Sequence, residues 1–268
     1  MHRGDPFSGI TRLIVTQNSC ENPYRGSRGG PGQIVDQLSG SPSCFTLLTN
    51  MTQYYIETDG KIYLVESRGQ LVFPRSREQI PFEIKRKAKM VVGSEEVIYS
   101  EPVLSRHPRE WMNKEDVPLL EDVDPTVQKA VNFSLPRVVV EAVIKKDEKV
   151  LLVKPSRGYN ENCWTLPGGF LVYSETPEDA VRREVEEEVG VEPSVNRLLN
   201  VYSARGAENS YQWVIFYFGA EISGDQGSLK PHHEIKQLRW FEPGEAAGAI
   251  NSPLMREGFE QIYQSGGE

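Results

Sequence analysis

The residues best suited to chemistry are three glutamates, Glu184, Glu187 and Glu188, which lie close together in one acidic segment. On a helix this spacing places the three carboxylates within about 100° of arc, so they face one common region. Like charges at such spacings repel each other, and a bound cation would relieve the repulsion. A solvated acidic helix face is the alternative interpretation. The spacing alone leaves both interpretations open.

A helix over residues 177–189 is predicted to carry these glutamates. Thr176 is a suitable N-cap, Pro177 suits the first helical position, and Gly190 is expected to end the helix. An apolar stripe next to the acidic edge consists of Val181, Val185 and Val189. The stripe would anchor the helix on a sheet while the carboxylates stay available.

Strand patterns rich in β-branched residues lie on both sides of this helix in the sequence. The predicted strands cover residues 138–144, 149–153, 195–203, 211–222 and 235–241. A closing helix is expected over residues 253–264. This order predicts an α/β fold with a mixed sheet flanked by helices.

The segment that contains the acidic helix resembles the Nudix box, G-x5-E-x7-R-E-U-x-E-E-x-G-U, in which U is aliphatic. Gly169 and Glu175 begin the pattern, and the run Arg183-Glu184-Val185-Glu186-Glu187-Glu188-Val189-Gly190-Val191 completes it at every defined position. Two undefined positions depart from many relatives, because Val172 replaces an acidic residue and Ser174 replaces a glycine. These departures concern the shape of the loop before the helix.

The resemblance covers residues 135–268, including a Leu-Pro-Gly-Gly entry to the box, and implies a Nudix-like α/β/α sandwich with a mixed sheet. It implies a hydrolase that uses Mg²⁺ or Mn²⁺ to cleave the pyrophosphate bond of a nucleoside diphosphate linked to another moiety. ADP-ribose, a nucleotide sugar and a dinucleotide are examples. Physical reasoning points to the same class, because phosphoanhydride hydrolysis needs charge neutralisation and an in-line water. The alternative is a nucleotide-sensing regulator, although an intact set of glutamates favours the enzyme.

The resemblance also assigns residues to the metal site and to the chemistry. The expected metal ligands are the Gly169 carbonyl and the carboxylates of Glu184, Glu187 and Glu188. The general base is expected to be Glu184 or, from outside the box, Glu234 with His233 behind it. Arg183 is expected to orient the glutamates by ion pairing, and Glu175 to support the junction of loop and helix.

Substrate contacts are expected between the second predicted strand and the box. Lys154 and Arg157 are the candidates for phosphate contacts. The aromatic candidates for stacking on a nucleobase are Trp164, Tyr202, Tyr211, Trp213 and Tyr217. Trp164, which lies two residues before the Leu-Pro-Gly-Gly entry to the box, is taken as the substrate-binding aromatic residue.

The first half of the chain carries no comparable motif. Residues 1–50 are rich in turn formers and are predicted to be mostly disordered, and Met51 is a candidate for the biological start. Residues 51–134 are predicted to form a small β-rich domain and linker, in which Asp59-Gly60 turns one strand into the next.

The composition narrows the range of partners. The 268 residues carry a net charge of −8, which disfavours broad binding to nucleic acid and leaves a small nucleotide diphosphate as the expected partner. No apolar run approaches a membrane span, and the first residues lack a basic segment followed by an apolar signal-peptide core, so a cytoplasmic location is expected. The sequence leaves a homodimer open.

Overall fold

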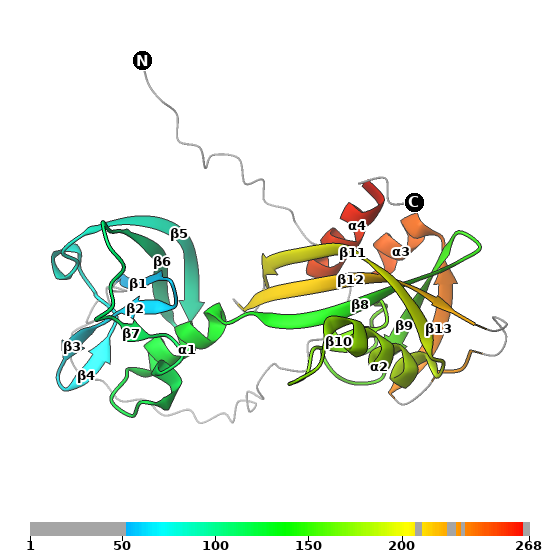
Figure 1. Ribbon diagram of the computed structural model, residues 1–268, viewed down its shortest axis with the longest axis horizontal. Coiled ribbons are helices and arrows are strands. Elements are labelled where there is room, and N and C mark those ends of the chain that lie inside the picture. Colours follow the sequence, from blue (N-terminus) through cyan, green and yellow to red (C-terminus); the bar gives the residue numbers. More distant parts are fainter. Residues whose placement is uncertain (1–51, 207–210, 224–228, 232–233, 265–268) are drawn as a thin grey trace, which may run out of the picture.

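The computed structural model describes residues 52–206, 211–223, 229–231 and 234–264. The expectations for residues 1–50 and for Met51 lie outside this part of the chain. The described residues form two bodies that are connected through helix α1, Pro125–Ser134 (Figure 1).

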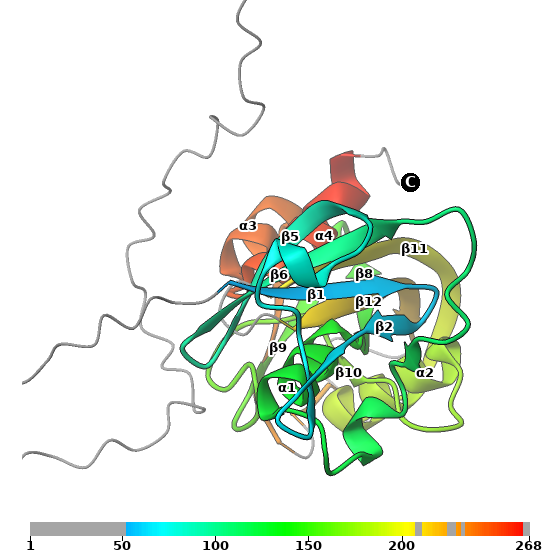
Figure 2. The ribbon, with the colours of Figure 1, turned by 90° about the vertical axis from the view of Figure 1, so that its left-hand side faces the viewer.

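The N-terminal body is built on a five-stranded sheet with the order β5-β6-β1-β2-β7. Its strands are β1 Gln53–Thr58, β2 Lys61–Tyr63, β5 Glu83–Val92, β6 Glu95–Val103 and β7 Met112–Asn113, with a separate hairpin of β3 Val65–Ser67 and β4 Gln70–Val72. Asp59 and Gly60 turn β1 into β2 with φ values of 49° and 71°, as the sequence predicts. Figure 2 shows β5, β6, β1 and β2 side by side. The predicted β-rich N-terminal domain is confirmed.

Residues well beyond the last strand complete the core of this body. Val117 and Val123 are buried in it, as are Val127, Ala130 and Val131 of α1. Asp124 caps α1 by accepting a hydrogen bond from the Thr126 amide at 2.8 Å. The helix therefore covers the N-terminal sheet before the chain enters the second body.

The C-terminal body contains a six-stranded mixed sheet with the order β11-β12-β8-β9-β13, and β10 pairs with β8 beside this path. Its elements are β8 Arg137–Lys146, β9 Lys149–Pro155, β10 Gly168–Phe170, α2 Pro177–Val189, β11 Pro193–Arg205, β12 Gln212–Ile222, β13 Ile235–Phe241, α3 Pro243–Ala249 and α4 Pro253–Gln264. Strand β12 runs parallel to β8 and antiparallel to β11. The expected mixed sheet and both expected helices are present, whereas α3 and β10 were not predicted.

Helices cover both faces of this sheet. Helix α2 packs its valines, Val181, Val185 and Val189, against one face, together with Val140 and Leu151. Helices α3 and α4 cover the other face, where Phe259 and Ile262 meet residues of β8, β9 and β12 (Figure 1). The predicted α/β/α sandwich is confirmed. None of the helices in the described ranges is both long and apolar enough to cross a membrane.

Candidate active site

The glutamates of α2 meet Gly168 and Gly169, the two glycines that begin strand β10. Strand β10 pairs antiparallel with β8, with Gly168 opposite Glu141. The Gly168 amide donates a hydrogen bond to Glu188 Oε2 at 3.0 Å. A Cβ atom on Gly169 would lie 2.4 Å from Glu184 Oε1, so only glycine allows this approach of backbone to carboxylate. The two glycines therefore bring two box glutamates against the backbone.

Arg183 ties the box together. Its Nε and Nη2 atoms donate to the two carboxylate oxygens of Glu175 at 2.8 and 3.1 Å, which is a bidentate contact. Its Nη1 donates to Glu184 at 2.7 Å and to Glu187 at 3.4 Å, and Nη2 reaches the Phe170 carbonyl at 3.1 Å. The arginine holds the pKa of Glu175 below its usual range. Loop and helix are thus joined by one guanidinium group.

The three glutamates expected to bind metal differ in their exposure. Glu188 is 9% exposed, whereas the side chains of Glu184 and Glu187 are 14% and 49% exposed. Burial raises the pKa of Glu188 to about 8, with the charges of Glu184 and Glu234 adding to the effect. Burial also raises the pKa of Glu184, although Arg183 opposes the shift. Neighbouring anions here are costly without a cation.

A fourth buried carboxyl group, Glu141 of β8, was not predicted. It is 2% exposed, and its pKa lies well above the usual value because of burial and the nearby charges of Glu188 and Glu184. The one signal in the sequence was an acidic residue inside the β-branched run 138–144. That run predicts a strand, but it does not show that Gly168 of β10 will pair with this residue.

The residues expected to contact substrate fall into two groups. Arg157 forms an ion pair with Glu234, whose charge also contributes to the raised pKa of Glu188. Lys154 lies over the ring of Trp164, with Nζ 5.6 Å from the ring centroid. His233, expected behind Glu234, lies outside the described residues.

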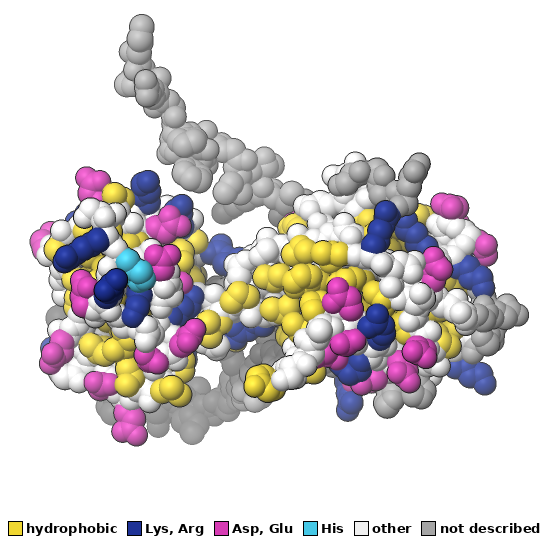
Figure 3. Space-filling model, in the orientation of Figure 1, with side chains coloured by type: hydrophobic (Ala, Val, Ile, Leu, Met, Phe, Trp, Pro, Cys, Tyr) yellow, Lys and Arg dark blue, Asp and Glu magenta, His cyan; other side chains and the backbone are white. Residues whose placement is uncertain are grey.

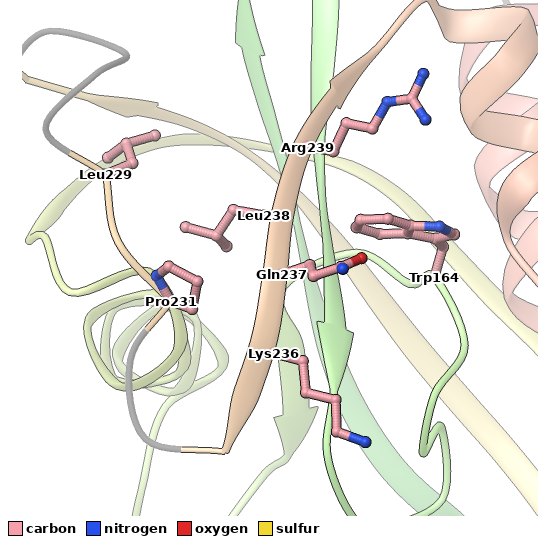
Figure 4. A pocket seen from close by; sticks show the side chains of 7 residues that line it. All are labelled: Trp164, Leu229, Pro231, Lys236, Gln237, Leu238 and Arg239. Carbon is pink, nitrogen blue, oxygen red and sulfur yellow. The ribbon is translucent and has the colours of Figure 1, made fainter.

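Trp164 lines a hollow on either side of β13. The hollow has a volume of about 450 Å³ and is lined by Trp164, Leu229, Pro231, Lys236, Gln237, Leu238 and Arg239 (Figure 4). In this view Gln237 and Arg239 extend toward the side of Trp164, whereas Leu238 extends toward Leu229 and Pro231. The glutamates of the box are absent from its lining, so this hollow is separate from the glycines of β10 and the carboxylates beside them.

Aromatic side chains lie directly beside the two glycines of β10. Phe170 follows Gly169, and its ring centroid is 5.9 Å from that of Trp213, which Tyr159 approaches to 5.7 Å. Phe170 and Tyr159 are 53% and 46% exposed, whereas Trp213 is buried. Figure 3 shows acidic and basic side chains together over α2, bordered by an apolar surface over β8, β11 and β12. Trp213 was a predicted candidate for stacking; Phe170 and Tyr159 were not.

The chemistry of this site suits a hard divalent cation. Within the described ranges, no three His, Cys, Asp or Glu side chains converge closely enough to hold a metal ion by themselves. Mg²⁺ does not require such a cage, because it commonly keeps several waters and uses one or two carboxylates plus substrate phosphates. The carboxylates beside Gly168 and Gly169 supply oxygen ligands of this kind. The residues present therefore fit Mg²⁺ or Mn²⁺.

Comparisons with known proteins agree with this arrangement. A family model described as the NUDIX domain matches residues 135–263. An ADP-ribose pyrophosphatase of Methanocaldococcus jannaschii is 37% identical over 107 residues, 40% of this chain and 62% of that protein. The uncharacterized Nudix hydrolase YvcI of Bacillus subtilis is 33% identical over 128 residues, 44% of this chain and 78% of that protein. A CTP pyrophosphohydrolase of Escherichia coli is 30% identical over 109 residues, 40% of this chain and 77% of that protein.

The C-terminal body is an α/β/α sandwich in which a glutamate-bearing helix lies beside two glycines of β10 and one arginine joins them. This arrangement defines a Nudix-type domain. The chain belongs to the Nudix family. The match spans less than two thirds of the length of the archaeal relative and lies in the C-terminal body of this chain.

Proposed function

We propose that this protein hydrolyses the pyrophosphate bond of a nucleoside diphosphate linked to another moiety, with Mg²⁺ or Mn²⁺ as the cofactor. The observation that carries the proposal is the contact of Glu184 and Glu188 with Gly168 and Gly169 at the start of β10. It is the feature of this chain best suited to hold a cation and a phosphate group at one point.

The cation would be held by the Gly169 carbonyl and by Glu184, Glu187 and Glu188, whose carboxylates would have to draw together on it because they do not converge in the described structure. When bound, it neutralises charge on the diphosphate and lowers the pKa of a water molecule. Arg183 keeps the Glu184 carboxylate beside Gly169 and thereby fixes the direction from which this glutamate acts. Glu175 acts through Arg183, which it anchors by two hydrogen bonds.

Glu184 is our proposed general base, and Glu234 is the alternative. Glu184 lies beside Gly169, and burial raises the pKa of its carboxyl group, which makes it a stronger proton acceptor. Glu234 lies outside the box, and its carboxylate forms an ion pair with Arg157. A Glu234→Gln variant that loses turnover as completely as Glu184→Gln would reverse this choice.

The nucleoside end of the substrate is proposed to lie on the aromatic group beside Gly169. Phe170 and Tyr159 expose ring faces next to Trp213, and an exposed ring face can stack on a base. Arg157 and Lys154 remain the proposed phosphate contacts. ADP-ribose and CTP, which the names of two relatives mention, are the first substrates to test.

A matched pair of variants tests the stacking. Stacking on one base contributes about 1–3 kcal/mol, so Phe170→Ala should raise KM for a nucleotide substrate about fivefold to 100-fold. Tyr173→Ala is the control, because Tyr173 is 99% exposed in the same loop and should leave KM unchanged. Ribose 5-diphosphate, which lacks a base, should be affected by neither change. An equal effect of Phe170→Ala on both substrates would refute the stacking.

The activity itself is tested with a substrate panel in Mg²⁺, with the products identified by mass. Glu184→Gln should lower turnover about 100-fold or more, whereas Glu186→Gln, an exposed neighbour on α2, should not. Nucleotide binding without hydrolysis by the unmodified protein would favour the sensing regulator instead.

A cytoplasmic location and a homodimer are also part of the proposal. Cell fractionation tests the first, and light scattering on the purified protein tests the second.

A further inference from the structure

Glu141 is a buried carboxyl group whose position calls for an explanation. It lies in the centre of the sheet, where β8 pairs it with Gly168 of β10 on one side and with Tyr217 of β12 on the other. Its side chain is 2% exposed, and its Oε2 atom has no hydrogen-bond partner in the described structure. A buried polar atom without a partner is costly, and such atoms often mark a functional role.

The carboxyl group of Glu141 lies next to the first glycine of the proposed active site, on the sheet face that carries Val139, Val143 and Tyr217. Its Oε2 atom lies 2.9 Å from the position that a Cβ on Gly168 would take. The amide of the same glycine donates to Glu188 Oε2 at 3.0 Å. One carboxyl group from the sheet and one from the helix therefore flank Gly168, directly before the Gly169 carbonyl.

We propose that Glu141 is an additional ligand of the divalent cation, supplied by the sheet and acting together with Glu188 across Gly168. The inference rests on the proposed function, because it adds a ligand from outside the box to that cation site. A buried carboxylate with one oxygen that lacks a hydrogen-bond donor is stabilised as an anion by a neighbouring positive charge. Divalent cations with oxygen ligands supply that charge.

Cation binding by the full-length protein without substrate tests this role. The free Mn²⁺ signal in electron paramagnetic resonance gives the dissociation constant directly. Glu141→Gln keeps the size of the side chain and removes its charge, and we expect it to weaken Mn²⁺ binding about tenfold to 100-fold. Glu186→Gln removes an exposed charge from the same acidic helix and should leave the constant unchanged.

A second variant separates ligation from packing. Glu141→Asp keeps the charge but shortens the side chain, so it should bind Mn²⁺ more tightly than Glu141→Gln. Equal losses in both variants would mean that the residue serves only packing and would overturn the inference. Unchanged Mn²⁺ affinity in Glu141→Gln would overturn it too, including the case in which only KM rises because the carboxyl group meets the substrate.

The same titration separates this inference from the proposed function. If the unmodified protein neither binds Mn²⁺ nor hydrolyses any nucleotide of the panel, both fail. If it binds Mn²⁺ and turns over substrate while Glu141→Gln binds equally well, only the role of Glu141 fails.

Discussion

Ser174 lies in the loop between β10 and α2 with a φ of 65°, in the left-handed region that favours glycine. Many Nudix domains have a glycine at this position, directly before the glutamate of the box. A non-glycine residue in this region costs about 1–2 kcal/mol. Glycine itself lowers the free energy of unfolding by about 0.5–1 kcal/mol, because it gives the unfolded chain more conformational freedom. We therefore expect Ser174→Gly to stabilise the C-terminal body by about 0.5–1 kcal/mol, or about 2–4 °C in Tm.

Urea denaturation of the full-length protein, followed by tryptophan fluorescence, measures this change. Ser194→Gly is the matched control, because Ser194 is exposed on β11 and pairs with Glu221 in an extended strand. That substitution should destabilise the protein by about 0.5–1 kcal/mol. A Ser174→Gly variant that loses stability as the control does would refute the argument from backbone strain.

Four further predictions concern the site and the N-terminal segment. Glu187→Gln relieves repulsion between carboxylates, so the metal-free variant should be no less stable than the metal-free unmodified protein. Its stabilisation by Mg²⁺ should shrink and its turnover should fall about tenfold or more. Thermal melts and product assays check this, and full Mg²⁺-dependent turnover would contradict the metal role of Glu187. Gly169→Ala would place a methyl group 2.4 Å from Glu184 Oε1 and should lower turnover about 100-fold with the fold retained by circular dichroism; activity near that of the unmodified protein would count against this geometry. Burial raises the pKa of Glu188 from 4.5 to about 8, so the folded state binds more protons between these values, and the free energy of unfolding in EDTA should fall as the pH rises from about 5 to 8. Glu188→Gln should reduce that slope in urea titrations, and identical slopes would show that Glu188 does not cause it. A chain beginning at Met51 should hydrolyse substrate as the full chain does, because residues 1–50 have little capacity to form a core; a folded but inactive product would contradict this.

Features determined by neighbouring residues were predictable from the sequence. Helix α2 has the predicted bounds because its ends are set locally. The Thr176 hydroxyl accepts a hydrogen bond from the Asp179 amide at 3.2 Å, and Gly190 ends the helix with a φ of 77°. Helix α3 was not predicted, since it has only seven residues, two of them are glycines, and Glu242 before it is not a favoured N-cap residue.

Contacts between distant parts of the chain were not predictable. The ion pair of Arg157 and Glu234 joins residues 77 positions apart, so an arginine expected at the substrate lies beside the alternative base. Glu141 enters the site because β10 returns to pair with β8, and β10 has three residues with no strand pattern. The pattern of a strand gives two faces but does not identify which face a later helix covers.

Mg²⁺-dependent hydrolysis of ADP-ribose and CTP, by the unmodified protein and by Glu184→Gln in parallel, tests the central claim most directly. We predict that the unmodified protein forms products split at the pyrophosphate bond, that EDTA abolishes this, and that Glu184→Gln lowers the rate about 100-fold. The proposal is that the glutamates beside Gly168 and Gly169 of β10 form the active site. Hydrolysis that persists in EDTA would contradict it, and so would a Glu184→Gln variant with an unchanged rate.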